Sequence, residues 1–259
     1  QTIKELSAVV KKDKSKVVSK ASHGELILTP IQHWFFEIHK NSPHFWNQIC
    51  EVDIPQSYSD QNLEKIILNL IETHDGLRQG FDKKNDKWKN KILNLKDVKA
   101  LYSIDISNLK EEDIENQIEK EIYEHQENYE IGRNYLFRGL LINVNKTKPK
   151  KLFLIAHHLI IDVISWQVIK KDFVSLYNQI NTGEPLHLDK NSSSYISYNN
   201  YINQIAISSN LNENLEYWKT QINANNRFPI DYEDNLPILE ADVDTIKFQI
   251  KEEVTNNIL

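Results

Sequence analysis

The chain has 259 residues, of which 40% are hydrophobic and 26% are charged, which is ample for a globular core in one or two domains. The formal net charge is −6 and the sequence holds no basic block, so a nucleic-acid partner is not expected. It contains no apolar run long enough to cross a bilayer, no signal peptide and a single cysteine, which argues against a membrane partner and a disulfide framework. These features fit a protein of the reducing cytoplasm.

The first 23 residues divide into two segments of different composition. Residues 1–10 place apolar side chains at a helical spacing, which predicts a short amphipathic helix. Residues 11–23 are rich in lysine and serine and show no core pattern, which is typical of a linker.

The region that follows alternates between predicted helices and strands. Thr29 and Pro30 form a helix start, with threonine as the cap and proline in the first turn, and the helix runs to about residue 40. Apolar patterns predict further helices at 60–73 and 109–128, strands at 45–54, 77–81, 88–93, 99–106 and 136–144, and a charged turn at 82–90.

The most reactive-looking stretch of the chain begins as a buried strand at 152–156 and ends in two adjacent histidines, His157 and His158. Asp162 follows four residues later, and an amphipathic helix is predicted from Ser165 to Ile180. Neighbouring strand residues point to opposite faces, so one histidine can face a given cleft while the other points into the protein. Histidine titrates near neutral pH, which suits proton transfer. From the residues themselves, a catalytic role and a structural role for one histidine stay equally open.

A metal site is a weaker interpretation of the same histidines. Adjacent histidines on a strand do not converge on one ion, and Cys50 lies far away in the sequence. We therefore expect no bound metal.

The C-terminal third begins after Gly183, which is a helix-ending residue. Helices are predicted at 194–207, at 211–222 and from 251 onward, an irregular acidic segment at 227–237 and a strand at 243–250. The mixed order of helices and strands along the chain predicts an α/β fold in which helices layer against a sheet.

The segment from His157 to Trp166 resembles the HHxxxDGxSW signature of the condensation-domain superfamily of nonribosomal peptide synthetases. Its Ser-Trp ending looks like the epimerization branch of that superfamily. Residues 28–37 are very similar to the LTPIQxWFFE opening of epimerization domains, and further matches follow in order at 45–48, 74–78 and 217–218.

The resemblance implies a two-layer lobe like that of chloramphenicol acetyltransferase, followed by the start of a second similar lobe. On this division residues 24–190 form the N-terminal lobe of an epimerization domain, and residues 191–259 form crossing helices and the start of an incomplete C-terminal lobe. Residues 1–10 resemble the last helix of a peptidyl carrier domain, which normally precedes an epimerization domain.

The resemblance also implies an activity, the L-to-D epimerization of an aminoacyl or peptidyl thioester by proton transfer at its α-carbon. The thioester is held on the phosphopantetheine arm of a partner carrier domain, so the domain needs no metal or bound cofactor of its own. Adjacent synthetase domains are the other expected partners. Two alternatives stay open: a condensation domain that forms an amide bond between carrier-bound groups, and an inactive member that only docks carriers. A free-standing acyltransferase fits less well with the carrier-like N-terminus.

The resemblance assigns roles to individual residues. His158, the second histidine of the motif, is expected to be the general acid/base. Asp162 is expected to shape the turn by pairing with an arginine, for which Arg78 and Arg138 are the candidates. A second acid/base group, a glutamate in the family's pattern, is expected outside these 259 residues.

Three further residues of the motif are expected to support the site: His157 by orienting or packing, and Ser165 and Trp166 by fixing the helix start. One position departs from the family, which usually has glycine after the aspartate, whereas this chain has Val163. Glycine allows backbone shapes and close approaches that a β-branched residue does not. Valine therefore predicts a narrower channel for the substrate arm or a reshaped turn.

Overall fold

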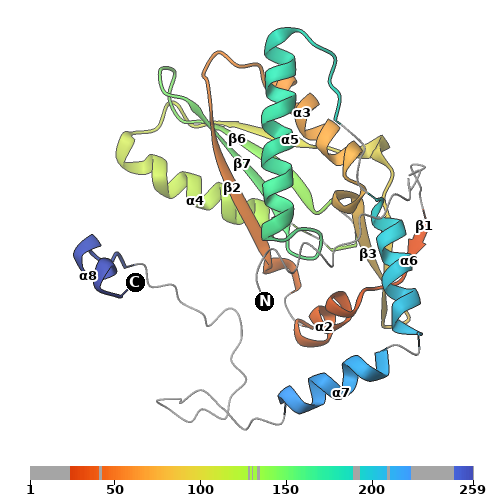
Figure 1. Cartoon of the computed structure of the whole chain (residues 1–259). Helices are drawn as coiled ribbons and strands as arrows, with labels where there is room; N and C mark the ends of the chain where they lie inside the picture. Colours follow the sequence, from red (N-terminus) through yellow and green to blue (C-terminus); the bar gives the residue numbers. More distant parts are fainter. Residues whose placement is uncertain are drawn as a thin grey trace. The chain divides into compact units, whose positions relative to one another are not determined.

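The computed structural model describes residues 24–40, 43–127, 129, 131–132, 135–188, 193–208, 211–222 and 248–258. Its larger sheet has four strands in the order β2 (Asn47–Ile54), β7 (Lys150–His157), β6 (Phe137–Asn143) and β5 (Leu101–Asp105) (Figure 1). Neighbouring strands are antiparallel except for β5 and β6, which run parallel. Because β7 is paired along both edges and covered on both faces, its apolar run is buried throughout.

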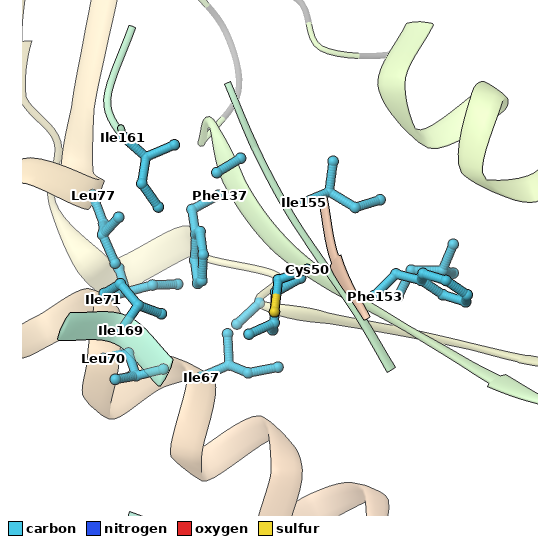
Figure 2. Close-up of a cluster of buried hydrophobic side chains, with 14 of the residues drawn as sticks. Cys50, Ile67, Leu70, Ile71, Leu77, Phe137, Phe153, Ile155, Ile161 and Ile169 are labelled. Atoms are coloured by element: carbon cyan, nitrogen blue, oxygen red, sulfur yellow. The ribbon is translucent and has the colours of Figure 1, made fainter. Parts of the chain in front are cut away.

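Two helices, α3 (Asp60–Thr73) and α5 (Val163–Thr182), pack against each other on one face of this sheet (Figure 1). α3 lies there because its apolar side chains share one face, and all of them are fully buried: Leu63, Ile66, Ile67, Leu70 and Ile71. Figure 2 shows this layer, with Ile67 and Ile71 beside Phe137 of β6, Cys50 of β2 and Ile169 of α5. The expected α/β class is confirmed.

The opposite face of the sheet is covered by α4 (Glu111–Glu127). Neighbouring residues of β6 show the division, because a side chain at Gly139 would meet Ile67 of α3, whereas Arg138 lies over the ring of Tyr102. His125 of α4 packs edge-on against that same tyrosine, at 4.8 Å between ring centroids. α4 has no fully buried side chain, so it covers the sheet through half-buried residues.

A second, three-stranded antiparallel sheet has the order β1 (Gly24–Leu26), β4 (Lys87–Ile92), β3 (Gln79–Lys84). The turn between β3 and β4 is Asn85-Asp86, with φ of 48° and 59°, a left-handed conformation that these two residue types tolerate. The expected charged turn at 82–90 is therefore wrong, because the strands continue through its lysines. The strand expected at 77–81 begins only at Gln79, since Asp75–Arg78 is a 3₁₀ helix.

Helices α2 (Pro30–Ile38) and α6 (Tyr195–Ala206) are joined to these strands by buried polar groups. Asn199 of α6 accepts from the backbone N–H of Ile27 at 3.3 Å and donates to its carbonyl oxygen at 2.6 Å. Gln32 of α2 donates to Gln79 at 2.9 Å and to the Tyr195 hydroxyl at 3.2 Å. α6 is thus hydrogen-bonded to the residue that follows β1 and to α2.

Two further 3₁₀ helices are present: Pro43–Phe45 lies between α2 and β2, and Leu95–Asp97 lies between β4 and β5. Residues 212–259 form a separate unit, which holds most of α7 (Leu211–Ile222) and all of α8 (Glu252–Ile258), both at expected positions. The segments expected at 1–10, 11–23 and 227–237, and most of the strand expected at 243–250, lie outside the described residues. Within the described part of the chain, every helix is too short or too polar to cross a bilayer.

Candidate active site

His158 directly follows β7 and lines a pocket of about 640 Å³. Its backbone N–H donates to the carbonyl oxygen of Trp46 at 2.6 Å, which extends the pairing of β2 and β7 by one residue. The chain then turns and enters α5 at Val163, so the His158 side chain is left exposed at the end of the sheet.

The neighbouring His157 points the other way and is 0% exposed. Its Nε2 lies 2.7 Å from the carbonyl oxygen of Pro43, and its Nδ1 lies 3.1 Å from the backbone nitrogen of Leu159. A carbonyl only accepts and a backbone N–H only donates, so Nε2 carries the ring proton and Nδ1 accepts. Burial lowers the pKa of His157 to about 4, so the ring is neutral near physiological pH. Both ring nitrogens are occupied by the protein, as strand alternation predicts for the inward-pointing histidine.

The His158 ring has a defined tautomer by the same reasoning. Its Nδ1 lies 2.8 Å from the carbonyl oxygen of Ile161, which requires a proton on Nδ1. The lone pair of the neutral ring is then on Nε2, which lies 3.1 Å from the amide nitrogen of Gln48. The accessible histidine therefore presents a proton-accepting nitrogen.

Trp166 reaches the same place from α5. Its indole N–H donates to the side-chain oxygen of Gln48 at 2.8 Å, while Gln48 contacts His158 with its other end. The sequence motif at 157–166 contains Trp166, but it gives no indication that Gln48 belongs to the site. The contact joins residues 118 positions apart, and no local pattern in the sequence signals it.

Asp162 caps the first turn of α5. One carboxylate oxygen, Oδ1, accepts from the Ser165 backbone N–H at 2.6 Å and from the Ser165 hydroxyl at 2.7 Å. These hydrogen bonds lower the pKa of the Asp162 carboxyl. Both donors of Ser165 thus contact the residue that caps α5.

The expected pairing of Asp162 with an arginine is wrong for the described residues. Arg78 is 4% exposed and donates from Nη1 to the carbonyl oxygen of Leu93 at 3.3 Å. Arg138 lies 3.9 Å from the ring centroid of Tyr129, on the α4 face of the sheet. The resemblance implies an arginine as the donor to Asp162. In the structure the backbone N–H and the hydroxyl of Ser165 donate to it.

The pocket therefore gathers some of the expected residues and not others. Four of them line it: His158, Asp162, Ser165 and Arg78. His157, Arg138 and Trp166 are not among the lining residues. Trp166 contacts Gln48, which in turn contacts His158.

Other polar residues of the pocket come from α3, the following 3₁₀ helix and α6. His74 contacts Asp172 of α5 at 2.8 Å, and Asp75 accepts from the backbone N–H of Tyr195 at 2.9 Å. Burial raises the pKa of Tyr195 to about 12, so its hydroxyl stays protonated. The motif at 74–78 indicates this region, but the partner of each residue follows only from the fold.

Val163 occupies the first helical position of α5 and is 66% exposed. It is not among the described non-glycine residues with positive φ, which are Asn85 and Asp86. Its backbone conformation is one that a β-branched residue adopts without strain. The turn does not require the glycine that the family usually has.

Comparisons with known proteins show which family the chain belongs to. A family model described as "Condensation domain" matches residues 22–259. The chain belongs to the condensation-domain family. Condensation domains of nonribosomal peptide synthetases act with carrier domains and neighbouring synthetase modules.

Relatives of this condensation-family chain include very long synthetases. It is 29% identical to one of the linear gramicidin synthase subunits of Brevibacillus parabrevis over 211 residues, covering 81% of this chain and 3% of that protein. It is 30% identical to one of the plipastatin synthase subunits of Bacillus subtilis over 222 residues, covering 84% of this chain and 8% of the relative. The chain thus spans a small fraction of the curated relatives that it matches.

Solved structures show the same fold. The epimerization domain from the third module of tyrocidine synthetase B superposes with a TM-score of 0.75 at 24% identity, covering 83% of this chain and 47% of that one. The starter condensation domain of rhizomide synthetase gives a TM-score of 0.67 at 15% identity, covering 78% and 49%. Both comparisons confirm the acetyltransferase-like α/β fold.

A metal centre finds no support in the described part of the chain. No three histidine, cysteine, aspartate or glutamate side chains converge there in a way that could hold an ion.

Proposed function

We propose that this chain forms part of an epimerization domain, in which His158 moves a proton at the α-carbon of a carrier-bound aminoacyl or peptidyl thioester. The observation that carries the proposal is the state of the His158 ring beside the pocket. Its Nδ1–H is engaged by the Ile161 carbonyl at 2.8 Å, so Nε2 is the atom that accepts a proton.

The chemistry suits a thioester substrate. A thioester stabilises the enolate formed on loss of the α-proton better than an amide or a carboxylic acid does. A neutral imidazole takes that proton, and return of a proton to the opposite face needs a second acid, for which the resemblance implies a glutamate. The phosphopantetheine belongs to the carrier domain and arrives as part of the substrate.

The other motif residues support His158 in this proposal. Asp162 and Ser165 hold the turn that places the Ile161 carbonyl against the His158 ring. At the end of β7, His157 donates a hydrogen bond to the carbonyl oxygen of Pro43. Arg78, in the pocket wall, donates a hydrogen bond to the carbonyl oxygen of Leu93.

Two observations support epimerization as the reaction. The Ser165-Trp166 ending and the segment at 28–37 resemble epimerization domains, and the tyrocidine synthetase neighbour is one. The second candidate is amide-bond formation between two carrier-bound groups, in which the same histidine would assist the attacking amine. It is favoured by the matched family model and by the starter condensation domain among the structural neighbours. The departure at Val163 favours a third candidate, a member that docks carriers without turnover.

Deuterium incorporation separates these functions. An aminoacyl thioester is loaded on the cognate carrier domain, the full-length protein is added in heavy water, and mass gain at the α-carbon is followed. In a parallel arm a second loaded carrier is supplied and amide product is measured. Epimerization predicts α-deuteration without a second carrier. Amide product without α-deuteration would establish condensation, and carrier binding with neither product would establish docking.

A further inference from the structure

We propose that Gln48 is a positioning residue for His158, and that Trp166 orients the Gln48 amide so that the His158 ring is held in its plane as the Nδ1–H tautomer. The meaning of this arrangement for catalysis rests on the proposed function, whereas the contacts themselves do not. Gln48 lies on β2 opposite Ala156 of β7, and its half-buried side chain bridges the indole and the imidazole.

The indole decides which way the amide faces. Trp166 is 7% exposed, and its Nε1–H is a donor only. The group 2.8 Å away must therefore be the amide oxygen of Gln48, which leaves the amide NH₂ facing His158. A flipped amide would set NH₂ against the indole N–H and leave a buried donor without its partner, which is unfavourable.

The imidazole of His158 then contacts an acceptor at one ring nitrogen and a donor at the other. The Ile161 carbonyl, 2.8 Å from Nδ1, requires a proton on that nitrogen. The Gln48 NH₂, 3.1 Å from Nε2, requires a lone pair on the other. Only the neutral Nδ1–H tautomer satisfies both, because the protonated ring would set a second N–H against the amide donor.

The charged groups around the ring act on this balance. Asp162 interacts with His158 electrostatically, and a carboxylate favours a proton on the ring. His74, Asp75 and Arg78 line the same pocket, and the adjacent His157 is buried and neutral. The Gln48 amide is the group in contact with Nε2 itself, and its NH₂ pairs with the Nε2 lone pair.

This arrangement has a consequence for substrate binding. In the free site the Nε2 lone pair is occupied by a hydrogen bond between two neutral groups, which is weaker than one to a charged group. A substrate proton displaces that bond at small cost and then meets a ring whose plane is already fixed. After proton transfer Nε2–H and the Gln48 NH₂ are both donors, so the hydrogen bond to Gln48 re-forms only when the ring gives up that proton.

The first turn of α5 helps to position both groups that contact the His158 ring, the Ile161 carbonyl and the Gln48 amide. The backbone N–H of Trp166 donates to the Asp162 carbonyl at 3.1 Å, in the first turn that Asp162 caps. Asp162, as the N-cap of α5, thus fixes the turn that contains the Ile161 carbonyl. It also fixes the helix start from which the Trp166 indole reaches Gln48.

The test is histidine-ring ¹⁵N NMR of the full chain, with the His158 signals identified by their loss in His158→Gln. In the wild type we expect a protonated Nδ1 and a hydrogen-bonded, unprotonated Nε2. Gln48→Glu keeps an acceptor for the indole but turns a carboxylate oxygen toward Nε2. The doubly protonated ring should then persist to a pH roughly 1–3 units higher than in the wild type, as for a charge partner in contact. Wild-type ring titration in Gln48→Glu would overturn the proposal.

Two other variants cover the case in which Gln48→Glu does not fold. Gln48→Leu has similar volume and no donor, so the Nε2 signal should move to that of an unbonded ring nitrogen. Trp166→Phe keeps the aromatic packing but frees the amide, and should weaken the same Nε2 signature. An unchanged Nε2 signal in both variants would contradict the proposal.

These measurements need no substrate, so they separate the two proposals. Absence of α-deuteration in the full-length protein would remove the proposed function and leave this inference standing. Unchanged ring signals alongside normal α-deuteration would do the reverse.

Discussion

The two adjacent histidines differ because the alternation of the strand gives their rings different surroundings. His157 meets protein on all sides, and burial lowers its pKa to about 4. His158 meets the pocket on one side and the Gln48 amide on the other. The same imidazole is a structural donor at one position and an accessible base at the next.

Titration of His157 should make the protein less stable in mild acid. The unfolded chain takes up a proton on this histidine near pH 6.5, whereas the folded chain resists until about pH 4. The contribution to stability is therefore complete above about pH 6.5 and is lost as the pH falls through this window. Urea unfolding at several pH values measures it, with His157→Gln as the matched variant that keeps an N–H for Pro43 but does not titrate. The free energy of unfolding of the wild type should fall more steeply, by up to about 1.4 kcal/mol per pH unit; equal slopes would count against the assignment.

Asp162 should contribute to stability as a helix cap rather than as an ion pair. Asp162→Ala should cost about 0.5–2 kcal/mol, whereas Asp162→Asn should cost less because asparagine is an equally good cap. The pKa of this carboxyl is lowered in the folded protein, so its contribution is present above about pH 3.9 and is lost as the pH falls through the folded value. Thermal unfolding near neutral pH compares the variants. A loss as large in asparagine as in alanine would point to a charge partner instead.

At the scale of elements, β6 lies between the helix layers, and Gly139 marks where α3 comes closest to it. A Cβ at this position would lie 2.5 Å from Cδ1 of Ile67 and 3.0 Å from Cδ1 of Leu101. The sheet and α3 approach each other closely here because the glycine has no side chain.

Gly139→Ala should therefore destabilise the protein by overpacking, by about 1–3 kcal/mol. Ile67→Val removes the Cδ1 methyl that the new side chain would meet, and should cost about 0.5–1.5 kcal/mol alone. In the double variant the combined loss should be smaller than the sum of the two single losses, as measured by chemical denaturation. Simple additivity would mean that the two residues do not meet.

Elements with a continuous apolar period can be predicted from the sequence, and the hairpin cannot. β7, α3 and α5 are predictable because each buries a complete stripe or run against the core. β4 alternates with lysines along its length, and the second half of β3 is charged, so the strand period is hidden within a charged segment. The turn at Asn85-Asp86 has the residue types of a tight hairpin, but this signal is lost among the surrounding charges.

At the scale of the whole molecule, α6 is hydrogen-bonded to the residue that follows β1 and to the pocket wall. Asn199 is 1% exposed and bonds both backbone groups of Ile27, while Tyr195 bonds Asp75 at the pocket wall. The pocket beside His158 depends on this helix for its Tyr195 and Tyr198 wall.

Asn199→Ala should release α6 locally without unfolding the larger sheet. Loss of the side chain removes two part-buried hydrogen bonds to the backbone of Ile27, each with a net value of about 0.5–1.5 kcal/mol. Hydrogen exchange should accelerate over 195–206 and around Ile27, while the amides of β6 and β7 stay protected. Asn200→Ala, an exposed position on the same helix, is the control. Faster exchange in the sheet as well would show that α6 is part of the global core.

The candidate site can be predicted in part. Its histidines, Asp162 and Ser165 follow from one continuous motif, and the family follows from the order of several motifs. The partners that define the chemistry cannot be predicted, because Gln48 lies 110 residues from His158 and meets it only when β2 pairs with β7. The expected pairing of Asp162 with Arg78 or Arg138 is not found, because the two arginines make other contacts and Oδ1 of Asp162 accepts from Ser165.

The most direct test of the account compares the two adjacent histidines in the same reaction. α-Deuteration of a carrier-bound thioester in heavy water is measured with the full-length protein, with His158→Gln and with His157→Gln. We predict that His158→Gln loses exchange by about 10²–10⁴-fold, the usual contribution of a general acid/base, while His157→Gln retains it if folded. Exchange that survives in His158→Gln and vanishes in a folded His157→Gln would contradict the assignment of His158 as the proton-transfer residue.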